Sequence, residues 1–138
     1  MKTCILISLL FYTASAFKYN VHLEVSKAWD IMASFPREKC ILQTGVDRNA
    51  ANVALLNMDL PEDYPFKCFS KCIFVELGFY NPATDTFNSD RILKGLVGIP
   101  SGLVEECSEK HKGVRDQCER VFSVITCGIA KIQSLPPL

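Results

Sequence analysis

The cysteines of this chain are the residues whose number and spacing point most clearly to a chemical role. The 138-residue sequence holds seven, and six of them follow residue 16 with the spacing C-x27-C-x3-C-x34-C-x10-C-x8-C, from Cys40 to Cys127. Cysteines form disulfides in oxidising compartments and bind metals or react as thiolates elsewhere. In an exported protein, an odd count implies a free thiol or one cysteine that is absent from the mature chain.

The first 16 residues explain the odd count. Lys2 precedes an apolar run from Cys4 to Tyr12, and Ala14-Ser15-Ala16 matches a cleavage site. This three-part pattern is typical of a secretory signal peptide, and the run is too short to span a membrane, which needs about 20 residues. We therefore predict a signal peptide over residues 1–16, one mature domain over residues 17–138, and secretion into an extracellular fluid without a membrane span.

Composition and motifs argue against several other classes. Lys and Arg number 15 against 15 Asp and Glu, so no basic excess indicates nucleic-acid binding. The nucleophile motif G-x-S-x-G is absent, and Gly98-Ile99-Pro100-Ser101-Gly102 reads better as a helix start, so we do not expect an enzyme. Cys68, Cys72 and His111 could bind zinc, but export favours disulfides, and we expect no metal.

Helical periodicity runs through most of the mature sequence. Helices are predicted at about 25–35, after a cap at Asp47, from a capping box at residues 59–62 to about 77, from 88–90 to 97, from a cap at Ser101 to about 111, and at 114–131. No stretch alternates with period two and ends in a hairpin signal. The sequence therefore predicts an all-α domain of five to seven short helices and no sheet.

Helix geometry restricts how the six cysteines can pair. Cys68 and Cys72 are four residues apart on one helical face, where a bond between them would be strained. Cys118 and Cys127 are nine residues apart on opposite faces of another helix, at a distance of roughly 13 Å along its axis. Excluding these two pairs leaves about ten connectivities open.

The cysteine spacing, the helices and the signal peptide together resemble the insect odorant-binding protein family, the six-cysteine group of pheromone-binding and general odorant-binding proteins. The x3 and x8 gaps match the family motif, x27 and x10 fall within its usual range, and x34 lies at or slightly below its short end. By position, the resemblance implies the disulfides Cys40–Cys72, Cys68–Cys118 and Cys107–Cys127. It also implies a compact bundle of about six helices, held by three interlocked disulfides around an apolar cavity.

The function implied by the resemblance is that of a secreted carrier. Such a protein binds odorant-like, pheromone-like or lipid molecules non-covalently in a fluid such as sensillar lymph, with no cofactor and no catalytic residues. A chemoreceptor or a second copy of the chain is the protein partner that such a carrier could have. The alternative is a disulfide-stabilised venom or salivary effector that acts through protein–protein contacts and exposes an apolar patch instead of an internal cavity.

Candidate ligand-binding residues lie on helical faces away from the cysteines or on apolar stripes. They are Trp29, Met32, Ser70, Phe74, Leu77, Leu96, Val97, Val104, Val121, Val124 and Ile125. Ser70 and Tyr80 are the candidate polar partners in a cavity of a few hundred Å³. Gly128 shares the stripe of the last helix, where it costs about 1 kcal/mol relative to alanine, which predicts a need for ligand space or for close helix contact.

Two further hypotheses concern ligand release. The short apolar tail Leu135–Leu138 could lie over the cavity as a lid, or could be a frayed terminus. His111 and His22 are the two residues that could make release depend on pH, because histidine titrates near neutrality.

Overall fold

The structure is a computed structural model that describes residues 16–133. The tail Leu135–Leu138 and all of the predicted signal peptide except Ala16 lie outside this range. Within it the chain forms seven helices, which confirms the all-α class: α1 Leu23–Ser34, α2 Arg37–Thr44, α3 Arg48–Asn57, α4 Tyr64–Glu76, α5 Ser89–Gly95, α6 Leu103–Lys110 and α7 Gln117–Ile132. None of these helices is long and apolar enough to cross a membrane.

The prediction of no sheet is wrong for two short antiparallel pairs. Strand β1 (Ala16–Lys18) pairs with β2 (Asp59–Pro61), and β3 (Tyr80–Asn81) pairs with β4 (Thr86–Phe87). Each pair has only two or three residues per strand, which is too short for period-two alternation to show in the sequence.

Helix starts follow the capping residues at most positions. The amide of Ala50 donates a 2.8 Å hydrogen bond to Asp47 Oδ1, and the amide of Arg91 donates one of 3.1 Å to Asn88 Oδ1. Side chains at these positions satisfy amides that the first helical turn leaves without partners. The predicted caps of α3 and α5 are therefore confirmed.

Three predicted helix starts are wrong. The last helix begins at Gln117 after the cap Asp116, three residues later than the predicted start at Val114. The segment Asp59–Pro61 is strand β2, and α4 begins at Tyr64, where Asp63 Oδ1 accepts a 2.9 Å hydrogen bond from the amide of Phe66. Helix α6 begins after Gly102, which has a left-handed backbone and no capping side chain, so Ser101 is not the cap. Helix α2 was not predicted separately; it begins directly after Pro36, which ends the run of α1.

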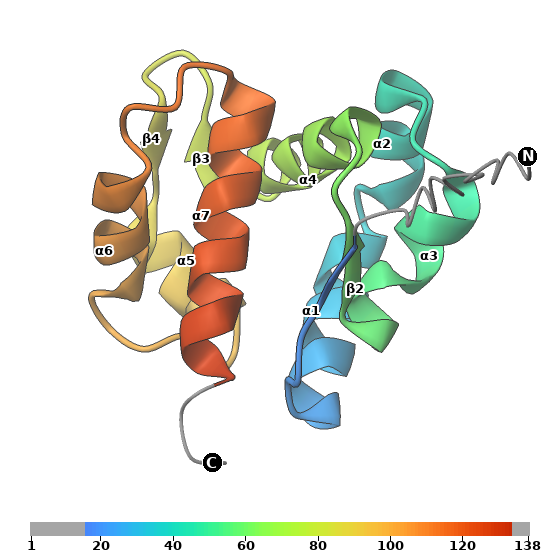
Figure 1. The fold of residues 1–138 in the computed structure, drawn as a ribbon, viewed down its shortest axis with the longest axis horizontal. Helices are drawn as coiled ribbons and strands as arrows, with labels where there is room; N and C mark the ends of the chain where they lie inside the picture. The colour runs from blue at the N-terminus through green and yellow to red at the C-terminus, as the bar shows by residue number, and fades with distance from the viewer. Residues whose placement is uncertain (1–15, 134–138) are drawn as a thin grey trace, which may run out of the picture.

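The helices form two groups joined by α4 (Figure 1). Helices α5 and α6 and the β3–β4 hairpin lie on one side of α7, and α1, α2 and α3 with β1–β2 lie on the other. Helix α4 packs against both α2 and α7, and so connects the groups. Buried apolar residues of α1, α4 and α7 belong to one core cluster.

Three disulfides connect four of the helices in series. Cys40 of α2 is bonded to Cys72 of α4, Cys68 of α4 to Cys118 of α7, and Cys107 of α6 to Cys127 of α7. These are the pairs that the family resemblance implies. Crosslinks that close loops of 20 to 50 residues each stabilise a fold by about 2–4 kcal/mol. The order α2–α4–α7–α6 is therefore fixed covalently.

Candidate ligand cavity

An apolar cavity of about 110 Å³ lies between the two groups of helices. Its wall comes from six helices and from the segments that follow α4 and α5. All 18 lining residues are apolar, glycine or disulfide-bonded: Trp29, Ala33, Leu55, Ile73, Phe74, Leu77, Phe79, Ile92, Leu96, Ile99, Leu103, Val104, Cys107, Val124, Ile125, Gly128, Ile129 and Ile132. Such a wall holds ligands by dispersion and by the hydrophobic effect.

The polar atoms nearest to this wall already have partners. The indole Nε1 of Trp29, which is 5% exposed, donates a 2.9 Å hydrogen bond to the carbonyl oxygen of Val97. This bond ties α1 to the segment after α5 and removes the one donor that the tryptophan could offer to a ligand. The Sγ atom of Cys107 is bonded to Cys127. The wall therefore offers a molecule of matching shape apolar contact and few hydrogen-bond partners.

The cavity is smaller than the few hundred Å³ expected from the sequence. Ligand pockets for drug-sized molecules measure about 300–1,000 Å³, whereas an apolar cavity of about 150 Å³ holds benzene. At about 110 Å³, the cavity fits a compact molecule of roughly that size without movement of its wall.

Seven of the candidate ligand residues lie in the cavity wall. They are Trp29, Phe74, Leu77, Leu96, Val104, Val124 and Ile125. They come from α1, α4, α6, α7 and the segments after α4 and α5, so the fold brings together positions that are far apart in the sequence. Their contact with a ligand stays a prediction.

Four candidates do not line the cavity, each for a local reason. Met32 packs against the buried cluster formed by Phe79, Ile92 and Val104. The hydroxyl of Ser70 donates to the carbonyl oxygen of Phe66 within α4, at 3.0 Å. Val97 is 48% exposed, and Val121 is completely buried without lining the cavity.

Tyr80 also lies away from the cavity and belongs to a partly buried polar cluster, in which the Asp85 side chain is 40% exposed. Its hydroxyl donates to Asp85 Oδ1, and Asp85 Oδ2 accepts a 3.1 Å hydrogen bond from Arg120 Nη1. Burial and the bond to Asp85 raise the pKa of Tyr80 well above its ordinary value, so the phenol remains a donor. The same Arg120 atom donates to the carbonyl oxygen of Lys112 at 3.2 Å. The cluster fastens the β3–β4 hairpin to α7 rather than serving a ligand.

Several wall residues were not among the candidates. Ile129 and Ile132 continue the α7 stripe of Ile125 at spacings of four and seven residues, a helical signal that the sequence did carry. Phe79 follows the end of α4, where no helical periodicity could mark it. Leu55 lies on α3, and nothing in its local sequence shows which helix it faces.

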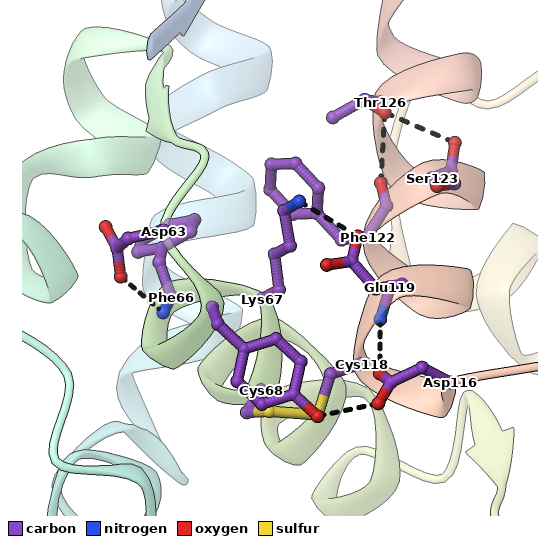
Figure 2. Close-up of polar contacts among 11 residues, drawn as sticks. Asp63, Phe66, Lys67, Cys68, Asp116, Cys118, Glu119, Phe122, Ser123 and Thr126 are labelled. Carbon is purple, nitrogen blue, oxygen red and sulfur yellow. Dashed lines mark hydrogen bonds and ion pairs between the residues drawn. A yellow bond between two sulfur atoms is a disulfide. The ribbon is translucent and has the colours of Figure 1, made fainter. Parts of the chain in front are cut away.

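The wall residues on α4 and α7 are held in place by a junction between these helices (Figure 2). The Cys68–Cys118 disulfide crosses the junction, and Lys67 Nζ lies 2.9 Å from Glu119 Oε2 and 5.5 Å from the centre of the Phe122 ring. The lysine side chain is only 18% exposed, so its ion pair is less screened than a surface pair. The ammonium group therefore has both an anion and an aromatic face as partners.

The start of α7 is fastened to α4 by a second set of contacts. The hydroxyl of Tyr64 donates a 2.7 Å hydrogen bond to Asp116 Oδ2. Asp116 Oδ1 accepts a 3.0 Å hydrogen bond from the amide of Glu119 (Figure 2). The hydrogen bond from the amide of Glu119, and then the one from Tyr64, lower the pKa of Asp116, so the carboxylate form is favoured. Together with the disulfide, these contacts fix where the wall segments of α4 and α7 meet.

Neither histidine reaches the cavity wall. His111 is the C-terminal cap of α6, where burial and then the charge of Lys110 lower its pKa. His22 is the N-cap residue of α1 and makes no capping hydrogen bond with its side chain. Direct control of a ligand by either imidazole therefore finds no support in the geometry, although the hypothesis of pH-dependent release stays open to measurement.

Between residues 16 and 133, no group of three or more His, Cys, Asp or Glu side chains is arranged to hold a metal ion. The six cysteines of this range, including the Cys68 and Cys72 pair considered for zinc, are all in disulfides.

A helical domain with three disulfides around an apolar cavity has the architecture of a carrier of small hydrophobic molecules. The sequence model of the PBP/GOBP family matches residues 26–131, which include all six paired cysteines and the whole cavity wall except Ile132. The chain belongs to this family, the insect odorant- and pheromone-binding proteins, which are binding proteins rather than enzymes. Neither the curated proteins nor the solved structures include a significant match to the chain.

Proposed function

We propose that this protein carries a compact apolar molecule, such as an odorant-like or pheromone-like volatile, through an extracellular fluid. The observation that carries the proposal is the cavity, whose wall is apolar throughout and contains no unpaired polar side chain. A ligand that leaves water for this cavity gains about 0.8 kcal/mol for each buried CH₂ group. An affinity near 1 µM corresponds to about −8 kcal/mol.

Carriage of this kind is non-covalent. The described part of the wall contains no acid, base or free nucleophile that could react with a ligand, so the proposal includes no catalytic step. Without a polar anchor, the shape of the cavity sets the orientation of the ligand. Release then breaks no hydrogen bond between the ligand and the wall.

The proposal includes secretion. We propose that residues 1–16 are removed on export and that the mature protein is the domain 17–138. The six cysteines would then pair in an oxidising fluid, where disulfides persist. The protein secreted by insect cells should begin at Phe17 on N-terminal sequencing, and a secreted chain that begins at Met1 would contradict this part of the proposal.

Calorimetric titration with benzene and short n-alkylbenzenes tests the carrier function. The disulfide-intact protein should bind one molecule saturably, with a negative heat-capacity change because apolar surface is buried. The variant Val124→Phe would place a ring in the cavity and should abolish binding. The matched variant Ala130→Phe adds the same ring to the exposed side of α7 and should bind as the wild type does. Absence of binding by the folded wild type would refute the proposal.

One observation favours the alternative of an effector. Ile31 and Phe35 at the end of α1 and Leu42 on the neighbouring α2 are 64%, 84% and 73% exposed, and exposed apolar side chains that gather on one surface can mark a protein contact. These residues lie outside the cavity wall, so the two functions can be separated. If the protein is a carrier, Phe35→Ala should keep the alkylbenzene affinity of the wild type. If it is an effector that acts through this surface, even the wild type should bind no alkylbenzene.

A further inference from the structure

Neither the backbone conformation nor the packing at position 128 explains why this residue is a glycine. It lies in the middle of α7, where glycine weakens a helix relative to alanine. Its φ is not in the left-handed region, in contrast to those of Gly45, Gly78 and Gly98. The backbone at this position would therefore accept an alanine without strain.

Close helix contact does not explain this glycine either. A Cβ atom placed on Gly128 would lie 4.0 Å from Leu103 Cδ2, an ordinary van der Waals distance, with no closer atom from another segment. Gly95 shows what a packing requirement looks like, because a Cβ atom there would lie 2.9 Å from the ring of Phe79. Of the two explanations that the sequence allowed, close contact is thus excluded and ligand space remains.

The side chain missing at Gly128 would point toward the cavity. Gly128 is part of the wall, on the same stripe of α7 as Val124, Ile125 and Ile132, which also line it. We propose that Gly128 determines ligand size: the absence of its side chain leaves room that the ligand occupies, and this room sets the largest molecule that fits. This inference rests on the proposed carrier function.

A side chain at position 128 should reduce the size of the ligand by a predictable amount. A methyl group at position 128 takes about the room of one ligand carbon, and one buried CH₂ group changes affinity about fourfold. The variant Gly128→Ala should therefore bind best an alkylbenzene about one carbon shorter than the wild type does. For the longest alkylbenzene that the wild type binds, the affinity should fall about fivefold or more, because overpacking is costly.

The experiment compares the wild type, Gly128→Ala and Gly113→Ala over a series from benzene to n-butylbenzene by calorimetry. Gly113 is an exposed turn glycine without a left-handed φ, and a Cβ atom there would meet nothing within 4 Å. Gly113→Ala should keep the wild-type order of affinities. Gly128→Ala should shift it toward shorter chains while its unfolding temperature stays equal or rises, since alanine favours the helix.

The possible results separate this inference from the proposed function. If the wild type binds no member of the series, the carrier proposal fails and the role of Gly128 fails with it. If the wild type binds but Gly128→Ala shows the same size preference, the carrier proposal stands and the inference is overturned. Failure of Gly128→Ala to fold would also overturn it, because the glycine would then serve packing.

Discussion

Val121 and Val124 offer a direct test of where the cavity lies. Both are buried residues of α7, three positions apart, and both are ligand candidates from the sequence. In the structure only Val124 lines the cavity, whereas Val121 is surrounded by protein and 0% exposed. The same substitution, valine to alanine, should therefore have different consequences at the two positions.

The magnitudes follow from what each side chain touches. Removing two methyl groups at Val121 costs about 1.6 kcal/mol of transfer free energy, and the closed void adds roughly 1 kcal/mol, for a total of about 2–3 kcal/mol. Val124 already borders open space and has fewer contacts to lose, so its loss should be about 1–2 kcal/mol. The gain in helix propensity from alanine is the same for both and cancels in the comparison.

Urea unfolding followed by circular dichroism, with the disulfides intact, would measure both free energies of unfolding. Calorimetry with the alkylbenzene series would show whether ligand size changes. Only Val124→Ala should accept longer chains, by about one or two carbons, because only its missing methyl groups add to the cavity. Equal destabilisation of the two variants, together with a size shift in Val121→Ala, would refute this assignment of the wall.

Three further predictions concern residues outside the wall. Asp85→Asn should lower the free energy of unfolding by about 1–2 kcal/mol, because Arg120 is 8% exposed and would lose its counterion. The control Glu38→Gln removes a surface ion pair and should change the free energy of unfolding far less. Similar losses for the two variants in urea titrations would contradict this prediction. The lowered pKa of His111 favours the neutral imidazole in the folded state, so the protein should lose stability as the pH falls through about 6.5. His111→Gln should reduce this loss, measured as the difference in free energy of unfolding between about pH 7.5 and about pH 5.5. An unchanged loss in His111→Gln would mean that other groups cause it. Deleting Leu135–Leu138 should weaken the binding of toluene, as a lid over the cavity requires, and unchanged affinity in calorimetry would rule out the lid.

Local signals predicted several helical elements from their capping side chains. Asp47 stands alone before a periodic stretch and caps α3. Asn88, Ser89 and Asp90 were all possible caps for the next stretch, and Asn88 is the one that caps α5. At the start of α4 the sequence offers two similar choices, with an aspartate shortly before a proline at Asp59 and again at Asp63. The first is occupied by pairing of β2 with β1, a contact across about 40 residues that local reasoning could not foresee.

The sequence predicted an apolar cavity but only part of the set of residues that line it. A helical stripe shows that Val121, Val124 and Ile125 face the interior, but the division between packed core and open cavity depends on which helices stand opposite. The same limit applies to Tyr80, whose polar atom is bound by Asp85, on the far side of the hairpin turn. The disulfide pairs came from the family resemblance, since helix geometry alone left about ten connectivities open.

The most direct test of the carrier function uses Trp29, the single tryptophan of the chain, which lies in the cavity wall. Its emission reports on the cavity without interference from any other tryptophan. Titration of the disulfide-intact protein with toluene should change the Trp29 emission saturably, to a plateau at one molecule per chain, and Val124→Phe should show no such change. Emission that stays constant across the titration while the protein remains folded would contradict the proposal that this cavity binds the ligand.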